Sequence, residues 1–287
     1  MIISIRRLVL TCCLLPLACA ADDDSLLALH VLDADHMEQW RLPERLQEVS
    51  GLALTSDERL LAVADEKAVV FEIDVDKRRL VKAFALGDPV LRGDFEGIAI
   101  VDDEVILITS DGDLYRSREG DDGEQVEYTL TETGLGKRCE IEGLAAHAAR
   151  QELLIACKQP RNGMQRVPIF VWSLPNAALI EERTIDLPLG PISKAIRERR
   201  LNPSGIAIDP QTGNLLLVAA RQRAIVELTS EGRLLSVVSL PLAHRHRQPE
   251  GIEIMRDGRL LIADEGGNHK ARLAVYAARS KRVVVEQ

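Results

Sequence analysis

A short sequence motif, called the phrase below, occurs five times in the chain and contains ten side chains with a polar oxygen. Every copy ends in a glycine followed by Leu or Ile. The glycines are Gly51, Gly97, Gly143, Gly205 and Gly251. One residue before each glycine stand Ser50, Glu96, Glu142, Ser204 and Glu250, and three residues before each stand Glu48, Asp94, Glu140, Asn202 and Gln248. A structural repeat explains the glycines, but it does not require ten oxygen donors.

The chemistry that suits such a set is the binding of a hard cation. Ca²⁺ takes many oxygen ligands in flexible geometry, Mg²⁺ requires a smaller octahedral site, and the phrase offers no sulfur or imidazole for zinc or copper. Carboxylates that converge need protons, water or a cation. We therefore expect a Ca²⁺ site, with Mg²⁺ as the second choice. Its candidate ligands are Glu96, Glu142, Glu250, Glu48, Asp94 and Glu140. The alternative is that these acids lie in solvated loops or cap backbone amides.

The spacing of the phrases predicts the fold that positions these side chains. The glycines are 46 residues apart in three of the four steps and 62 apart in the other. A period of this size with strand-like content is typical of an all-β propeller with one four-stranded antiparallel blade per repeat. In the last unit we expect strands at 251–255, 260–263, 272–276 and 282–285. The first strand of each blade should line a central channel. Because strand side chains alternate between two faces, the donors one residue before the glycine (the inner tier) and three residues before it (the outer tier) should share a face and meet at one mouth of the channel.

Two regions depart from the repeat. Five phrases favour five blades, but residues 29–42 resemble the outer half of a unit and would either close the ring or begin a sixth blade. The longer step places about 16 additional residues between Lys158 and Asn202, where residues 192–200 should form a short helix. We expect one propeller domain over residues 29–287.

Loops that follow the second strand of each blade should open at the same mouth as the phrases. Three of them carry acids, at Asp65, Asp111 and Asp264, whereas the other two carry Lys158 and Arg221. Lys158 and Arg221 are therefore candidate anion contacts beside the cation. Solvated loop charge is the alternative.

The N-terminus and the net charge limit the cellular setting. Arg6 and Arg7, the apolar run 8–17 and the small residues before position 21 predict a signal peptide over residues 1–20. A lipid anchor at Cys19 is the less favoured alternative to simple export to the periplasm or cell envelope. The net charge of −9 disfavours nucleic acid as a partner. The basic runs 197–200 and 244–247 are expected to be solvated loop charge. We expect no transmembrane span and a monomer.

Export also bears on the two cysteines outside the signal, Cys139 and Cys157. They flank a predicted hairpin of strands 143–147 and 153–157, whose turn lies midway between them. In an oxidising compartment this placement predicts a disulfide between neighbouring strands. Two separate thiols are the alternative.

Catalytic signatures are mostly absent from the sequence. There is no Gly-x-Ser-x-Gly elbow and no His-Glu-x-x-His motif, and His147, His244, His246 and His269 have no patterned partners. Only the central carboxylates would support hydrolysis, through metal-activated water with a spare Glu as base.

The phrases around Gly51, Gly97, Gly143 and Gly251 resemble those of the SdiA-regulated (YjiK-like) family, exported bacterial propellers distantly related to NHL-repeat proteins. The resemblance covers residues 29–286 and implies five blades, a calcium site with Glu96, Glu142 and Glu250 foremost, and no established activity. We therefore expect a calcium-binding propeller that binds a small ligand or a protein on the channel-mouth face. The alternative is a metal-dependent hydrolase of lactones or phosphoesters, by similarity to gluconolactonase and phytase-like propellers.

Overall fold

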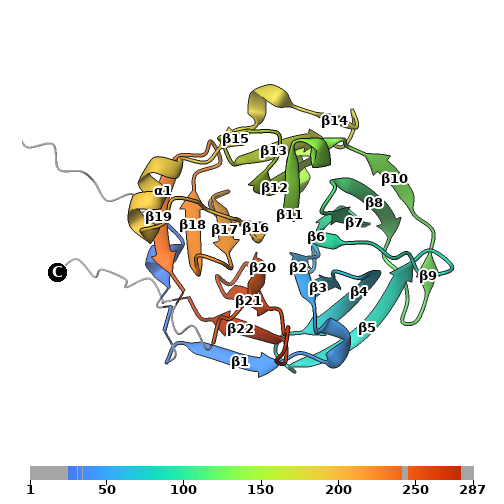
Figure 1. Cartoon of the computed structure of the whole chain (residues 1–287). Helices are drawn as coiled ribbons and strands as arrows, with labels where there is room; N and C mark the ends of the chain where they lie inside the picture. The colour runs from blue at the N-terminus through green and yellow to red at the C-terminus, as the bar shows by residue number, and fades with distance from the viewer. Residues whose placement is uncertain (1–24, 31, 34, 241–244, 279–287) are drawn as a thin grey trace, which may run out of the picture.

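The computed structural model describes residues 25–30, 32–33, 35–240 and 245–278. Five small antiparallel sheets stand in a ring around a central axis, as Figure 1 shows. Each sheet begins at the axis with a strand that carries the repeated phrase. The predicted five-bladed β-propeller is therefore confirmed. The expected signal peptide and the strand expected at 282–285 lie outside the described residues.

The blades follow one another along the chain. Blade one holds β2 (Val49–Leu54), β3 (Leu60–Ala64), β4 (Lys67–Asp74) and β5 (Arg79–Leu86), with β9 (Gln125–Val126) parallel to β5. Blade two holds β6 (Phe95–Val101), β7 (Glu104–Thr109), β8 (Asp113–Arg118) and β10 (Thr129–Glu132). Blade three holds β11 (Cys139–His147), β12 (Glu152–Pro160) and β13 (Pro168–Ser173), with β14 (Ala178–Leu179) and β15 (Ile185–Asp186) both paired to β13. Blade four holds β16 (Gly205–Ile208), β17 (Leu215–Ala219), β18 (Ala224–Leu228) and β19 (Leu234–Ser239).

Blade five joins the two ends of the described chain. Its inner strands are β20 (Pro249–Ile254), β21 (Leu260–Asp264) and β22 (Arg272–Tyr276), and its outermost strand is β1 (Met37–Arg41). β1 pairs antiparallel with β22 along all five of its residues. β1, which belongs to the segment 29–42, thus closes the ring, one of the two alternatives predicted for that segment, and the described residues form no sixth blade.

The helices are short and lie outside the blades. The α-helix α1 (Leu189–Ile196) packs against β19 and buries Ile192. The 3₁₀ turns are η1 (Leu27–Leu29), η2 (Glu44–Leu46), η3 (Leu135–Lys137), η4 (Ala148–Arg150) and η5 (Glu181–Arg183). The additional residues of the long step form β14, η5, β15 and α1. The helix expected at 192–200 begins earlier, at Leu189, and ends at Ile196, because Arg197 has a left-handed backbone with φ of 59°.

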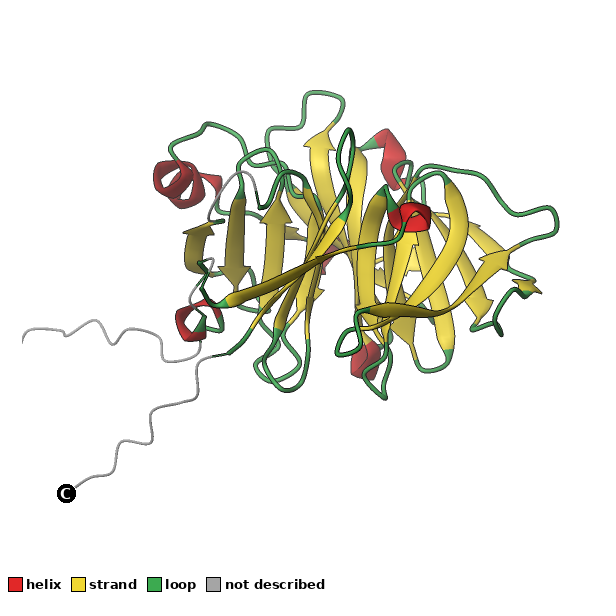
Figure 2. Ribbon diagram, turned by 90° about the horizontal axis from the view of Figure 1, so that it is seen from below, coloured by secondary structure: helices red, strands yellow, loops and turns green. Residues whose placement is uncertain are grey.

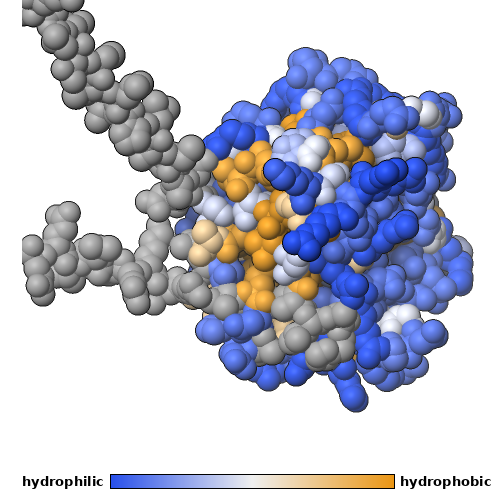
Figure 3. Space-filling view, turned by 60° about the vertical axis from the view of Figure 1, so that its left-hand side comes forward, coloured by the Kyte–Doolittle hydropathy of each residue, from blue (hydrophilic) through white to orange (hydrophobic). Residues whose placement is uncertain are grey.

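The core lies between neighbouring blades, whose strands Figure 2 shows from the side. β17 is buried along its whole length (LLLVA), because the sheets of blades three and five cover its two faces. The outermost strand β19 is only partly buried. Figure 3 brings this side of the ring forward and shows apolar surface gathered there within a mainly hydrophilic exterior. In the described part of the chain, no helix is long and apolar enough to cross a membrane.

The repeated glycine permits the innermost strands to approach one another. A Cβ atom on Gly97 would lie 2.7 Å from the backbone nitrogen of Leu144 in the next blade, and one on Gly205 would collide with the carbonyl oxygen of Glu250. No side chain fits at such a distance from a neighbouring backbone. The glycines therefore set the diameter of the ring at its axis.

Closure of the ring through β1 gives the first testable prediction. A chain that starts at Pro43 lacks β1 and the η1 turn before it, so β22 becomes an exposed edge. Because Trp40 and Met37 pack against two of the core clusters, we expect the free energy of unfolding to fall by at least about 3 kcal/mol. Chemical denaturation of this chain and of one starting at Ser25 measures the difference. Equal stability of the two chains would show that β1 does not close the ring.

Candidate functional site

In blades one, two, three and five, the residue before the glycine lies at an irregularity of the innermost strand, whereas β16 of blade four begins at Gly205 without one. In blades one, two and five the ladder steps from Val49 to Gly51, from Phe95 to Gly97 and from Pro249 to Gly251, so that one residue between them has no partner across the strand. The unpaired residues are Ser50, Glu96 and Glu250. Blade three shows a similar shift around Glu142. Such bulges re-aim a side chain at the end of a strand, and the simple two-residue alternation expected for the two tiers does not hold here.

The two serines of the inner tier join neighbouring blades. The Ser50 hydroxyl donates to the carbonyl oxygen of Phe95 at 2.7 Å, and the Ser204 hydroxyl donates to that of Pro249 at 2.7 Å. Each acceptor belongs to the phrase of the next blade. Both serines are buried, so these bonds fix the spacing between innermost strands where the phrase has no carboxylate.

The three glutamates of the inner tier, Glu96, Glu142 and Glu250, are called the channel glutamates below. Burial raises the pKa of each of them, and repulsion from Glu142 is the next cause for both Glu96 and Glu250. The pKa of Glu250 rises to about 8. Its Oε2 atom is buried without a hydrogen-bond partner. The phrases thus bring three mutually repelling carboxyl groups together at the axis.

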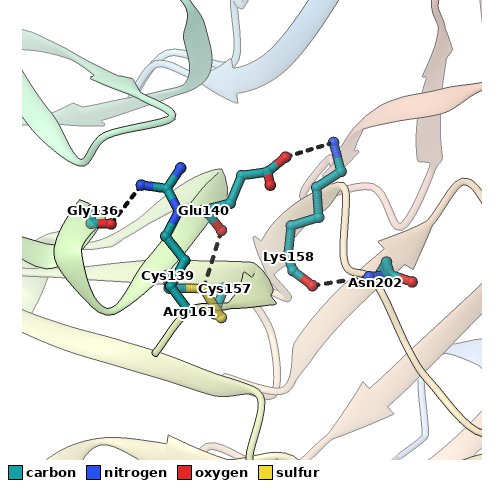
Figure 4. The surroundings of a disulfide bond; sticks show 7 residues. All are labelled: Gly136, Cys139, Glu140, Cys157, Lys158, Arg161 and Asn202. Atoms are coloured by element: carbon teal, nitrogen blue, oxygen red, sulfur yellow. Dashed lines mark hydrogen bonds and ion pairs between the residues drawn. A yellow bond between two sulfur atoms is a disulfide. The ribbon is translucent and has the colours of Figure 1, made fainter. Parts of the chain in front are cut away.

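One cation of the chain lies among the channel glutamates. The Lys158 ammonium forms an ion pair with Glu142 and lies 3.5 Å from Oε1 of Glu140. The Glu142 side chain is 5% exposed. Burial lowers the pKa of Lys158, but the Glu142 and Glu140 carboxylates outweigh this effect and raise it. Figure 4 shows the lysine reaching toward Glu140, with its carbonyl accepting a hydrogen bond from the Asn202 amide at 3.2 Å. Lys158 therefore contacts acids, and it lies within β12 rather than in the loop expected there.

A disulfide lies directly beside this lysine. Cys139 and Cys157 are bonded, with their Cα atoms 5.8 Å apart, which confirms the predicted pairing. Both are fully buried, and they tie β11 to β12 where the bulge disturbs the ladder. Because of the bulge, the ladder partner of Cys139 is Pro160 and that of Cys157 is Ile141. The bond thus fixes the two strands that carry Glu142 and Lys158 (Figure 4).

The outer tier, three residues before each glycine, is more exposed and forms local contacts. Asp94 accepts a hydrogen bond from Ser110, and Glu140 lies beside Lys158. Asn202 bonds with Gln222 at 3.1 Å, and the Gln248 amide donates to Glu265. Glu48 raises the pKa of Asp65, to about 6, although burial of Asp65 is the larger cause. The six candidate ligands therefore divide into three at the axis, of which Glu142 is buried and Glu96 and Glu250 are half-buried, and three at the rim of the mouth.

The chemistry of the three channel glutamates fits a hard divalent cation. All three groups are carboxylates, and one buried oxygen of Glu250 has no partner. In the described residues, however, no three acidic, His or Cys side chains already stand as a group that could hold a metal ion. Glu96 and Glu250 would hold the cation if it binds, whereas Glu142 is engaged by Lys158. Arg221, the other candidate anion contact, is exposed.

The opposite mouth of the channel holds a carboxyl group that the repeat pattern did not single out. A cavity of about 290 Å³ is lined there by the ends of the innermost strands, among them Leu54, Ile100, Ala146 and Ile208. Glu253 of β20 lines it as well. Burial raises the pKa of Glu253 to about 8, although the backbone amides of Ile254 and Leu54 donate to it. Only its place two residues after Gly251, where the other phrases have Ala, marks it in the sequence.

Solved structures similar to this chain include different kinds of protein. Glutaminyl cyclase of Myxococcus xanthus has a TM-score of 0.55 and 11% identity, over 85% of this chain and 96% of that one. U3-55K has a TM-score of 0.54 and 10% identity, over 86% and 100%. Luciferin-regenerating enzyme has a TM-score of 0.53 and 9% identity, over 84% and 95%. At these identities the likeness shows the propeller fold alone. No curated protein matches the sequence.

One family model matches the last third of the chain. Residues 190–285 match the SdiA-regulated family. The resemblance predicted from the phrases is thus confirmed over this segment, which contains α1, blade four and the strands β20–β22. Two of the five phrases, those at Gly205 and Gly251, lie within the SdiA-regulated match.

Glu253 gives the second testable prediction. Because its pKa is about 8 in the folded protein and near 4.5 unfolded, the folded state binds more protons between these values, and stability falls as the pH rises through this range. Glu253→Gln removes this loss. We expect the variant to match the wild type near pH 4 and to exceed it by about 2–4 kcal/mol at pH 8. Denaturation at several pH values in EDTA measures the effect.

Glu198→Gln is the control, because Glu198 is exposed and should not change the pH dependence. A Glu253→Gln variant whose stability follows that of the wild type at every pH would show that Glu253 ionises freely in the fold.

Proposed function

We propose that this chain is an exported propeller that binds a divalent cation, by preference Ca²⁺, between Glu96 and Glu250 at the channel mouth. The observation that carries the proposal is the charge at the axis. Three carboxyl groups with raised pKa, one buried and two half-buried, share one ammonium group, that of Lys158. A cation that enters the channel would replace the protons that these groups otherwise retain, and would give the Glu250 Oε2 atom a partner.

Lys158 determines how many acids are left for the cation. Its ion pair with Glu142 neutralises one buried carboxylate within the protein. Glu96 and Glu250 make no comparable ion pair among the described residues. Two carboxylates with backbone carbonyls and water suit Ca²⁺, which accepts mixed oxygen ligands at 2.3–2.6 Å. Lys158 also repels a second cation, so we expect one ion and modest affinity.

The role that we propose for the cation is structural support of a binding surface. The mouth is formed by loops from all five blades, and loops on a rigid scaffold are common binding elements. The ion would fix the innermost strands, and the mouth would present a surface to a small ligand or a protein. Export is supported by the disulfide, since structural disulfides persist in oxidising compartments.

The hydrolase alternative makes a different demand on the same residues. It needs a cation with an open position for water and a carboxylate free to take a proton. Similar folds include two proteins described as enzymes, glutaminyl cyclase and luciferin-regenerating enzyme, but the fold does not transfer an activity. No contact in the described structure favours hydrolysis, so it remains an alternative.

Thermal unfolding of the protein from residue 25 onward, in EDTA and then with Ca²⁺ or Mg²⁺ restored, tests the proposal. At 100 times Kd, a cation that binds only the folded state adds about 2.7 kcal/mol to the free energy of unfolding. We expect a rise in Tm that is larger with Ca²⁺ than with Mg²⁺. An absence of any rise, with complete removal of metal confirmed by elemental analysis, would contradict the proposed site.

Glu96→Gln gives the third testable prediction, because it separates binding from folding. The substitution replaces a carboxyl group whose ionisation the fold disfavours with a neutral amide, so without divalent cations the variant should be at least as stable as the wild type at pH 8. It should also lose most of the stabilisation by Ca²⁺. Glu127→Gln is the matched control, since Glu127 is exposed. A Glu96→Gln variant that keeps the full Ca²⁺ response would place the ion elsewhere. Lactone and phosphoester hydrolysis by the same Ca²⁺-loaded proteins tests the alternative.

A further inference from the structure

A second cavity, of about 570 Å³, lies at the edge of blade five beside the channel-mouth loops. β1, β22 and β21, which border it, lie side by side at the bottom of Figure 1. Five cationic side chains line it, those of Arg41, Arg245, Arg247, Lys270 and Arg272. Its acids are Glu44, Asp264 and Glu265. A surplus of positive charge in a cavity is unusual for a protein with net charge −9.

None of the five cationic side chains forms an ion pair within the described residues. The only side-chain hydrogen bond among them runs from the Arg272 guanidinium to Oε1 of Gln39, at 3.1 Å. Elsewhere the chain pairs its arginines readily, as with Arg59, which contacts Asp57, Glu72 and Glu119. Asp264 is the ladder partner of Arg272 on the side away from β1, but the five cations outnumber the three acids of the cavity, so a net positive charge remains among its described lining residues.

Two of the arginines face each other directly. Arg41 of β1 and Arg272 of β22 are partners in the antiparallel ladder, which puts their side chains on the same face of the sheet. Like charges at such a position destabilise the pairing of two strands. This is also the pairing that closes the ring. An anion held between the two guanidinium groups would turn the repulsion into attraction.

The wall opposite these arginines is rigid. Gln47 reaches beneath the loop that follows β21, and its amide donates to the carbonyl oxygens of Gly267 and His269. A Cβ atom on Gly266 would collide with this amide and would lie 2.7 Å from the nitrogen of Ala271. The loop therefore packs closely on Gln47, which holds this wall of the cavity in place.

A buried hydrogen-bonded group supports the base of the cavity. His246 is fully buried between Asp264, at 2.7 Å, and the Tyr276 hydroxyl, at 2.6 Å. His246 stands between the two lining arginines Arg245 and Arg247, so its fixed position also fixes the segment that carries them. Asp264 lines the cavity, and its Oδ1 atom is buried without a partner, which leaves one acceptor in the wall unsatisfied.

We propose that this cavity is a binding site for a small phosphorylated molecule, with the phosphate between Arg41 and Arg272. Guanidinium groups match the oxygens of phosphate in paired hydrogen bonds. The volume is in the range of small-molecule sites, and Asp264 and Glu265 offer acceptors for hydroxyl groups of the ligand. A hollow with fixed walls suits a soluble phosphomonoester better than the head group of a lipid in a membrane. The site does not require the channel cation.

Titration calorimetry of the protein from residue 25 onward with glycerol 3-phosphate, in EDTA at low ionic strength, tests the proposal. We expect saturable one-site binding that weakens as salt is added. The double variant Arg41→Gln/Arg272→Gln should bind at least about tenfold more weakly for each arginine removed. Without ligand it should be as stable as the wild type or more stable, because the repulsion between β1 and β22 is gone.

Arg199→Gln/Arg200→Gln carries the same change in charge on exposed residues away from the cavity and should bind as the wild type does. Sedimentation with vesicles of phosphatidic acid and phosphatidylcholine forms a second arm. Binding of the vesicles without binding of glycerol 3-phosphate would overturn the proposal in favour of a lipid surface. Equal loss of binding in both double variants would reduce the site to non-specific charge, and absence of binding to either probe would also overturn it.

Discussion

The close approach of the innermost strands at the axis is the constraint on which the rest of this propeller depends. At Gly97 and Gly205 a single additional carbon would collide with the backbone of another blade. The residue before each glycine lies at this approach, and in blades one, two and five a bulge leaves it unpaired in the ladder. In two blades this residue is a serine that bonds the neighbouring blade. In the other three it is a glutamate, and the same geometry that packs the ring concentrates negative charge at its axis.

The structure limits this charge without removing it. Lys158 neutralises Glu142, and the adjacent disulfide holds the two strands that carry the pair. Glu96 and Glu250 keep raised pKa values instead. Blade five carries the opposite excess, because the cationic side chains around Arg41 and Arg272 outnumber the acids there and form no ion pair with any described residue. Both features concern groups that the chain leaves unpaired near one mouth, and unpaired charge of this kind destabilises a fold unless a ligand compensates it.

The ring of five blades could be predicted from the sequence because each sequence repeat corresponds to one blade. The glycine spacing, the disulfide and the insertion follow from period, hairpin geometry and segment length, and the structure confirms each of them. The division of the ten donors was not predictable, because it depends on bulges that a two-residue alternation cannot reveal. Lys158 was expected in a loop as an anion contact, yet it lies on β12 among acids. The contacts of Glu253 and of the arginines of β1 and β22 come from strands that are distant in the sequence. No local sequence pattern therefore marks these residues.

The release of protons on cation binding is the most direct test of whether Ca²⁺ binds between the channel glutamates. If the channel glutamates hold protons because they repel one another, Ca²⁺ must displace those protons when it binds. Calorimetric titration with Ca²⁺ at pH 7, in buffers of different ionisation enthalpy, measures this release. We expect one bound ion and a release of protons that Glu96→Gln reduces. Binding without proton release, or a release unchanged in Glu96→Gln, would contradict it.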